Sequence, residues 1–199
     1  SLDLAATHAL LCDTVRQGGM AARVHTGDPS LYGAIREQAI LLDASGIPWD
    51  VVPGVTAAFA TAAGARASLT IPALRQSLII TRLSGRTSVP DRERLRDLAA
   101  HKAAMAVYLS GADPEGVARE LVQGGMDHST RVVVGYRVGW PDERILESTL
   151  GEMGDMVREA GLSRQLLFLI LPSDDDAGEE RSKLYDTSFS HGFRKGGES

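Results

Sequence analysis

The feature that most constrains the fold is the alternation of strand-like and helix-like segments along the chain. Short apolar runs of a strand's length alternate with longer segments that carry apolar residues at helical spacing, and most connections are short. This pattern is typical of α/β proteins, in which a helix returns the chain to the start of the next parallel strand. The pattern predicts strands at 22–25, 49–52, 77–81, 104–109, 132–136, 144–149 and 166–171, and helices at 2–16, 31–45, 55–65, 91–100, 114–124 and 152–160.

These elements predict an α/β fold of two lobes. Residues 1–74 are expected to form an N-terminal lobe with a parallel sheet, because a helix separates each pair of its strands. In the C-terminal lobe, residues 75–172, the loop between the strands near 136 and 144 is too short for a crossover helix. That pair is therefore expected to be antiparallel, which makes the second sheet mixed. Residues 173–199 are expected to form an acidic linker and a tail.

The composition bounds the class of protein. Of 199 residues, 43% are hydrophobic and 24% charged, which is typical of a soluble globular chain. A net charge of −5 and an aromatic content of 5% argue against a nucleic-acid partner. The sequence has no apolar run of membrane-spanning length, and its five histidines lack metal-ligand spacing. One cysteine, Cys12, fits a reducing cytoplasm, so we expect a cytoplasmic protein without membrane or metal partners.

The stretch HTGDPSLYG, residues 25–33, places a turn between an expected strand and an expected helix. Asp28 can cap the helix, and Pro29 suits its first turn. Gly27 allows either a tight turn or the close approach of a ligand to the backbone. The residues leave both interpretations open: a capped turn or a ligand site.

The stretch VVPGVTAAF, residues 51–59, repeats this order of strand, turn and helix. Thr56 lies near the start of a helix of small residues, where it can either cap the helix or contact a ligand. Ligands of open α/β sheets bind at the carboxyl ends of the strands. If the turns at Gly27 and Thr56 lie at one edge of a sheet, they frame a single crevice.

Two arginines flank a glycine turn in SLIITRLSGRTSVP, residues 77–90. Arg82 and Arg86 lie on either side of Ser84, directly after an apolar strand. Planar guanidinium groups bind carboxylates with two parallel hydrogen bonds, so this loop is a candidate for binding an acidic ligand. The alternative is a pair of solvated surface arginines.

A third arginine lies on the tight loop of YRVGWPDER, residues 136–144. Arg137 precedes Trp140 and Pro141 there, and it is a further candidate for binding a carboxylate. The alternative is an ordinary hairpin with a buried indole.

Taken together and in this order, these stretches resemble the tetrapyrrole (corrin/porphyrin) methylase family, and the resemblance covers essentially the whole chain. The GDP and PGVTA stretches are common to the family, whereas TR-SGRT, WPDE and the tail favour the members that methylate precorrin-4 or cobalt-precorrin-4 at C11. The residues that carry the resemblance are GDPSLYG at 27–33, VVPGVTAAFATAA at 51–63, QSLIITRLSGRTSVP at 76–90, VYLSG at 107–111, YRVGWPDE at 136–143 and LYDTSFSHGFR at 184–194.

The resemblance implies a fold of two α/β lobes with S-adenosylmethionine (S-adenosyl-L-methionine) in the cleft between them, in a homodimer. It implies C-methylation of precorrin-4, or of cobalt-precorrin-4, at C11 in cobalamin biosynthesis, with a ring carbon attacking the sulfonium methyl group. The implied cofactor contacts are Thr26, Gly27, Asp28, Leu31, Thr56, Ala57, Leu109, Arg137 and Val138, the last through its backbone. The carboxylates of the tetrapyrrole substrate are assigned to Arg82, Ser84 and Arg86, with Arg75 and Arg137 as further candidates.

The chain departs from the family at its start. Members of the family begin with a strand and a loop of the Gly-x-Gly-Pro-Gly-Asp kind, whereas this chain begins Ser-Leu-Asp. We therefore expect a trimmed chain that lacks at least one βα unit. Two alternatives stay open: an inactive remnant that binds the cofactor, and a related methylase acting at another position. A generic nucleotide-binding module is disfavoured, because no phosphate-cradling glycine loop is present. No carboxylate is singled out as a proton acceptor.

Overall fold

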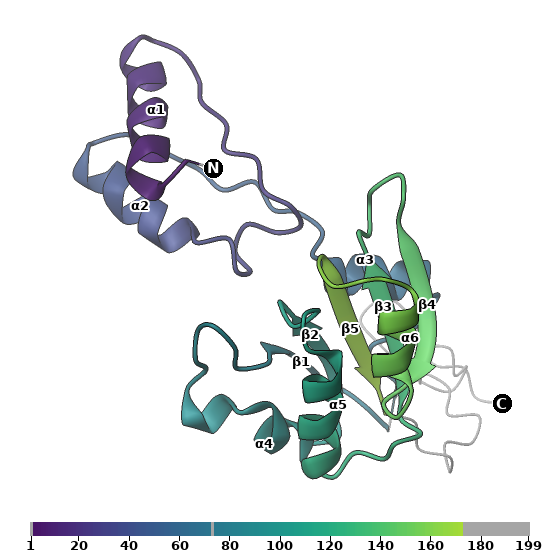
Figure 1. The fold of residues 1–199 in the computed structure, drawn as a ribbon. Helices are drawn as coiled ribbons and strands as arrows, with labels where there is room; N and C mark the ends of the chain where they lie inside the picture. The colour runs from purple at the N-terminus through teal and green to yellow at the C-terminus, as the bar shows by residue number, and fades with distance from the viewer. Residues whose placement is uncertain (1, 73, 173–199) are drawn as a thin grey trace, which may run out of the picture. The chain divides into compact units, whose positions relative to one another are not determined.

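The computed structural model describes residues 2–72 and 74–172, and it divides the chain into two compact units (Figure 1). The first unit is Ser1–Ala57 and the second is Ala58–Ser199. The sequence pattern predicts a lobe boundary at residues 74–75, whereas the compact units meet at Ala57 and Ala58. The predicted linker and tail at 173–199 lie outside the described residues.

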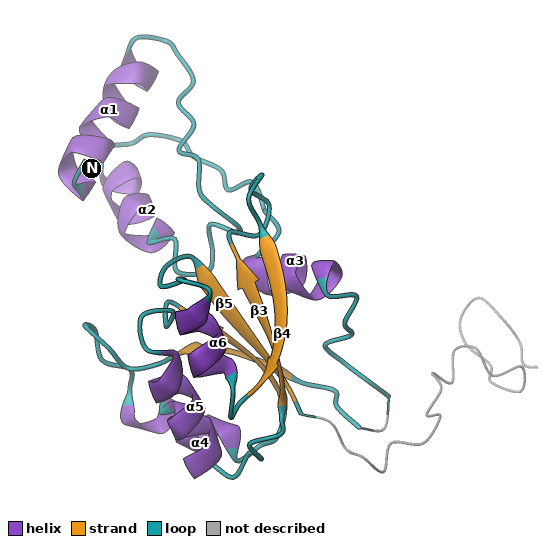
Figure 2. Cartoon of the chain, turned by 45° about the vertical axis from the view of Figure 1, so that its right-hand side comes forward, coloured by secondary structure: helices purple, strands orange, loops and turns teal. Residues whose placement is uncertain are grey.

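The first unit contains the helices α1, Leu4–Arg16, and α2, Ile35–Ala44. Asp3 begins α1, because its carboxylate accepts a hydrogen bond of 2.8 Å from the Ala6 backbone nitrogen. The two helices lie side by side (Figures 1 and 2), and a hydrogen bond of 3.0 Å joins His8 Nε2 to Ser45 Oγ.

The strands predicted at 22–25 and 49–52 are wrong. Neither segment has a strand partner among the described residues, so the parallel sheet expected in the first unit is not formed there. Val24 and Val52 are instead 91% and 81% exposed. Valine favours an extended backbone, but an extended segment becomes a strand only where another strand supplies its hydrogen bonds.

A helix predicted at 31–45 begins later, at Ile35. Residues 29–33 form turns, and Ala34 is in the left-handed region with φ 52°. A left-handed residue cannot continue a right-handed helix, so α2 starts directly after it.

The second unit is built on a five-stranded sheet with the order β1-β2-β5-β3-β4. β1 and β2 are parallel, and all other neighbours are antiparallel. This confirms the α/β class, the mixed sheet and the antiparallel pair β3 and β4. The strands are β1, Leu78–Arg82; β2, Ala104–Tyr108; β3, Arg131–Tyr136; β4, Arg144–Thr149; and β5, Leu166–Leu171.

Helices α4, α5 and α6 cover one face of this sheet, and α3 lies on the other face (Figure 2). The sheet separates them because side chains alternate: Val132 and Val134 belong to the core under α4–α6, whereas Gly135 faces Thr61 of α3. The helices are α3, Ala57–Gly64; α4, Leu95–Ala99; α5, Pro114–Gln123; and α6, Met153–Glu159.

Capping signals in the sequence account for some helix ends and not for others. Asp113 caps α5 by accepting a 2.8 Å hydrogen bond from the Gly116 backbone nitrogen, and Pro114 is the first helical residue, as predicted. The helix predicted at 91–100 is instead a short 3₁₀ turn, Asp91–Glu93, followed by α4. Arg94 separates the two with an extended backbone at φ −60° and ψ 137°.

Three strands of the sheet end at the same edge. β2 and β3 are both antiparallel to β5, so they run in one direction, and β1 runs parallel to β2. Arg82 is paired in register with Tyr108, and Tyr136 with Leu166. The loops 83–90, 109–113 and 137–143 therefore leave the sheet at one edge, where α/β proteins place their ligands.

Candidate functional site

In the first unit, the turn that contains Gly27 lies against the turn that precedes α3. An ideal Cβ atom on Gly27 would lie 3.7 Å from Thr56 Cα and 3.8 Å from the Ala57 backbone nitrogen. Gly27 has φ +70°, the left-handed conformation that only glycine adopts without strain. The structure thus brings together two segments that are far apart in the sequence and that the resemblance assigns to one cofactor.

Asp28 joins these two turns. One carboxylate oxygen accepts a hydrogen bond from the Ser30 backbone nitrogen at 2.8 Å, and the other accepts one from the Gly54 backbone nitrogen at 2.9 Å. These bonds stabilise the charged form, so they hold the pKa of Asp28 below its usual range, with the bond from Gly54 as the larger cause. The prediction that Asp28 caps the next helix is therefore wrong, since its carboxylate connects turns instead.

Close packing of the two turns requires glycine at position 54. A Cβ atom there would lie 2.1 Å from the Gly27 carbonyl oxygen and 3.4 Å from Asp28 Cα. Thr26 and Gly27 are exposed, and Thr56 is buried. Leu31 is half-buried and donates its backbone N–H to the Asp28 carbonyl at 3.2 Å. The turns therefore leave backbone exposed at Thr26 and Gly27.

The other predicted cofactor residues lie in the second unit, at the carboxyl ends of β2 and β3. Leu109 and Arg137 each follow the last residue of a strand, and both are in the left-handed region, with φ 53° and 47°. Leu109 is 71% exposed, which is unusual for a leucine, and its left-handed backbone is strained. Arg137 is anchored by a 3.1 Å bond from its backbone nitrogen to the Gln165 carbonyl, and Val138 follows it.

A hydrogen-bond chain through Tyr108 and Ser110 organises this edge. The Tyr108 hydroxyl accepts a 2.8 Å bond from the Ala58 backbone nitrogen at the start of α3. Ser110 Oγ donates to the Tyr108 carbonyl at 2.7 Å and accepts from the Leu83 backbone nitrogen at 2.9 Å. Residue types alone gave Tyr108 and Ser110 of VYLSG no role, although a serine two residues after a buried strand can bond to the backbone in this way.

The predicted arginines do different things in the structure. The Arg82 guanidinium donates to the carbonyls of Thr87 and Ser88, both at 2.8 Å. Arg86 and Ser84 are exposed, and the described residues give the Arg86 side chain no hydrogen bond or ion pair. The Arg75 guanidinium donates to the Pro172 carbonyl. Of this set, the tip of the loop at Ser84 and Arg86 has the groups available for an acidic ligand.

Arg137 makes its contacts within its own hairpin loop. Its Nε atom lies 3.1 Å from Asp142 Oδ1, close enough for an ion pair but without hydrogen-bond geometry. Its guanidinium also lies 4.6 Å from the centre of the Trp140 ring. Trp140 is 43% exposed, so the alternative of a hairpin with a buried indole is wrong.

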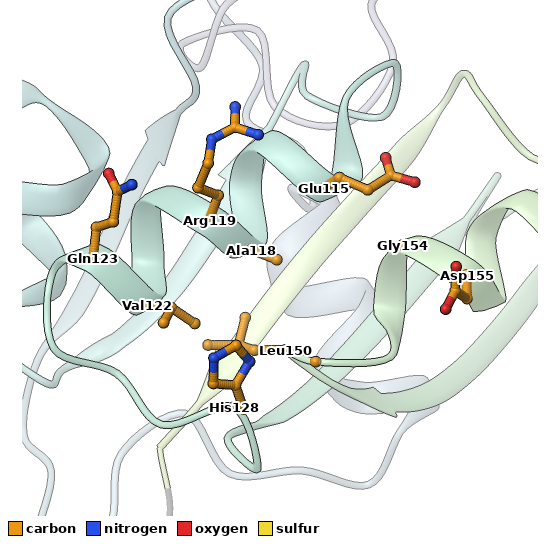
Figure 3. A pocket seen from close by; sticks show the side chains of 10 residues that line it. Glu115, Ala118, Arg119, Val122, Gln123, His128, Leu150, Gly154 and Asp155 are labelled. Atoms are coloured by element: carbon orange, nitrogen blue, oxygen red, sulfur yellow. The ribbon is translucent and has the colours of Figure 1, made fainter.

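A shallow hollow of about 520 Å³ lies elsewhere in the second unit, between α5 and α6 (Figure 3). Ala118, Val122 and Leu150 form its floor, while Arg119 and Gln123 point away from Leu150. Two residues that line the hollow, Glu115 and Asp155, each form an ion pair with Arg158. None of the predicted site residues lines it.

The described residues 2–72 and 74–172 contain no group of three or more histidine, cysteine, aspartate or glutamate side chains placed to hold a metal ion. No helix among them has the length and apolarity needed to span a membrane.

Comparisons with known proteins agree with these features. The chain is 47% identical over 190 residues to the cobalt-precorrin-4 C(11)-methyltransferase of Priestia megaterium, covering 94% of this chain and 73% of that protein. It is 40% identical over 196 residues to the precorrin-4 C(11)-methyltransferase of Pseudomonas aeruginosa, covering 98% of this chain and 78% of that protein.

Solved structures show the same likeness. The cobalt-precorrin-4 methyltransferase CbiF matches with a TM-score of 0.83 and 44% identity over 86% of this chain and 72% of that one. The uroporphyrin-III C-methyltransferase from Thermus thermophilus, solved with S-adenosylhomocysteine, matches with a TM-score of 0.66 and 25% identity over 82% of this chain and 71% of that one. Residues 3–154 match the family of tetrapyrrole (corrin/porphyrin) methylases, and the chain belongs to that family.

Proposed function

We propose that this chain is an S-adenosylmethionine-dependent C-methyltransferase that methylates precorrin-4 or cobalt-precorrin-4 at C11 in cobalamin biosynthesis. The observation that carries the proposal is the 47% identity to a cobalt-precorrin-4 C(11)-methyltransferase over 94% of the chain. The local geometry supports it, because two separate turns of the first unit are joined by the Asp28 carboxylate and leave backbone exposed.

The residues fit S-adenosylmethionine by their chemistry. Gly27 and Gly54 have no side chains to cover the backbone, and the Asp28 carboxylate accepts hydrogen bonds that hold the two turns together. We therefore assign backbone contacts to Thr26 and Gly27, with Asp28 as the residue that positions them. In the second unit, the exposed Leu109 side chain offers an apolar contact, and the backbone at Arg137 and Val138 offers polar ones.

When bound, S-adenosylmethionine supplies a methyl group already activated by its sulfonium sulfur. The protein then has to hold the two reactants in line and keep water away, which needs no covalent protein intermediate. Within each unit, hydrogen bonds already fix the backbone of the turns or of the strand ends, so these backbone groups lose little entropy on binding.

The substrate carries several carboxylates, whereas the chain has a net charge of −5. Binding must therefore come from local cations rather than from overall charge. Arg86, with Ser84 beside it at the loop tip, is our candidate, since the described residues leave its guanidinium unpaired. Each charge-assisted hydrogen bond contributes roughly 1.5–3 kcal/mol.

A second candidate function is methylation of another tetrapyrrole position. It is favoured by 31% identity over 164 residues to the uroporphyrinogen-III C-methyltransferase of Paracoccus denitrificans. The lower identity and coverage, 82% of this chain and 57% of that protein, make it the weaker candidate. A homodimer stays a prediction from the resemblance, and a cytoplasmic location stays one from the single cysteine. Light scattering of the purified chain measures the oligomeric state.

The test is methyl transfer by the purified chain. The chain is incubated with methyl-labelled S-adenosylmethionine and either cobalt-precorrin-4, precorrin-4 or uroporphyrinogen III, and the products are analysed by mass spectrometry and by nuclear magnetic resonance. We expect one labelled methyl group at C11 of a precorrin-4 substrate. Transfer only to uroporphyrinogen III would favour the second candidate. Cofactor binding without any transfer would contradict both functions and support an inactive chain.

A further inference from the structure

We propose that Arg82 is a positioning residue: it fixes the loop of residues 83–88 so that Arg86 meets the substrate, and it does not bind a substrate carboxylate itself. The inference rests on the proposed function and deepens it, because it divides the two predicted substrate arginines into different roles. The contacts of the two guanidinium groups carry the argument.

The guanidinium of Arg82 is already occupied by its own loop. Its Nη1 donates to the Thr87 carbonyl and its Nη2 donates to the Ser88 carbonyl, each at 2.8 Å. Two parallel bonds from one planar fork to two successive carbonyls hold a loop in a single orientation. The guanidinium keeps further N–H groups, but a carboxylate that drew it out of this position would cost the bonds to both carbonyls, and the loop would lose its main side-chain support.

The start of the loop is fixed as well. The Leu83 backbone nitrogen donates to Ser110 Oγ at 2.9 Å, which ties the exit of β1 to the exit of β2. Within the loop, the Gly85 backbone nitrogen donates to the Thr87 carbonyl at 3.2 Å. Arg82 and Ser110 therefore hold the two ends of a short turn whose tip is Ser84, Gly85 and Arg86.

Arg86 differs from Arg82 in the groups that it leaves available. It is exposed at the tip, and the described residues give its side chain neither a hydrogen bond nor an ion pair. A guanidinium presented on a fixed loop loses less conformational entropy when a carboxylate binds than one on a free loop. Arg82 thus contributes to substrate affinity indirectly, by ordering the backbone that carries Arg86.

Hydrogen–deuterium exchange of the full chain tests the loop directly, without substrate. In Arg82→Ala, we expect the amides of Leu83 and Gly85, which donate to Ser110 Oγ and to the Thr87 carbonyl, to exchange several-fold faster, because the loop that holds these bonds has lost its support from Arg82. Arg82→Lys should give an intermediate rate, since a lysine cannot form the planar fork. Arg86→Ala and the charge-matched control Arg92→Ala should leave these rates unchanged. Unchanged exchange in Arg82→Ala would overturn the proposal.

A double-mutant cycle tests the consequence for binding of cobalt-precorrin-4 in the presence of S-adenosylhomocysteine. Each single change, Arg82→Ala or Arg86→Ala, should weaken substrate binding about tenfold. Because Arg82 acts through Arg86, adding Arg82→Ala to Arg86→Ala should cost less than about threefold more. Additive losses would overturn the positioning role, since they would show that both arginines bind substrate. If the unchanged chain binds no tetrapyrrole, the proposed function fails, and the exchange experiment still decides the role of Arg82 in the loop.

Discussion

Replacing Gly54 by alanine is expected to separate the two turns of the first unit. The added Cβ atom would lie 2.1 Å from the Gly27 carbonyl oxygen and 3.0 Å from its carbonyl carbon. Both atoms belong to backbone, so no flexible side chain can move aside. The turns must part by about 1 Å to reach an ordinary contact, and such overpacking costs about 1–3 kcal/mol of stability.

The same shift should also weaken function. Moving the Gly54 nitrogen by about 1 Å breaks its 2.9 Å hydrogen bond to Asp28, the bond that joins the turns. A misplacement of about 1 Å in groups that position a reactant lowers the rate by roughly 100-fold. We therefore expect kcat/KM for methyl transfer to fall by about two orders of magnitude, with a clear loss of S-adenosylmethionine affinity in calorimetry.

Gly151→Ala is the matched control for this change. A Cβ atom on Gly151 would meet its nearest neighbour at 3.5 Å, an ordinary contact, and the residue lies beside His128, away from the predicted site residues. This variant should keep the binding and the activity of the unchanged chain. If Gly54→Ala folds and binds S-adenosylmethionine within twofold of the unchanged chain, the contact between the turns does not shape the cofactor site.

Two further predictions concern stability in the second unit. Thr61 is fully buried, and its hydroxyl has no hydrogen-bond partner among the described residues. Thr61→Val should therefore raise the free energy of unfolding, measured in urea, by about 1 kcal/mol. A lower free energy of unfolding would show that the hydroxyl has a partner. Hydrogen bonds from Arg96 are the main cause that lowers the pKa of Glu120 below its usual 4.5. The Arg96–Glu120 pair therefore stabilises the fold above pH 4.5, and this stabilisation is lost as the pH falls through the lower pKa of the folded state. Glu120→Gln should therefore cost about 0.5–1 kcal/mol near pH 7 and progressively less below pH 4.5, measured by urea unfolding across this range; a cost independent of pH would contradict the ion pair.

Much of the second unit could be predicted from local sequence. The apolar runs at 104–109 and 166–171 are strands, and Asp113 with Pro114 marks the start of α5. The short loop after Tyr136 correctly predicted an antiparallel pair, because it leaves no room for a crossover helix. In each case the decisive residues lie within the element or directly beside it.

The candidate site shows where local sequence stops being informative. Arg82 and Arg86 belong to one motif and look equivalent in the sequence, yet one holds its own loop and the other is exposed. Asp28 fits a helix cap by its position, but its second carboxylate oxygen bonds to Gly54, 26 residues away. Arg82 bonds to carbonyls only five and six residues away, and Asp28 bonds to a residue 26 positions away, but the spacing of residue types indicates neither contact.

The sequence by itself determined the strands of the second unit, the capped start of α5 and the family, because all of these depend on residue types in short, continuous stretches. Only the tertiary structure decided that the segments at 22–25 and 49–52 have no strand partners, that β5 lies between β2 and β3, and that Leu109 and Arg137 take left-handed conformations at one edge. The physical reason is that a strand or a bridging carboxylate depends on hydrogen bonds from distant segments, and these partners are chosen when the chain packs.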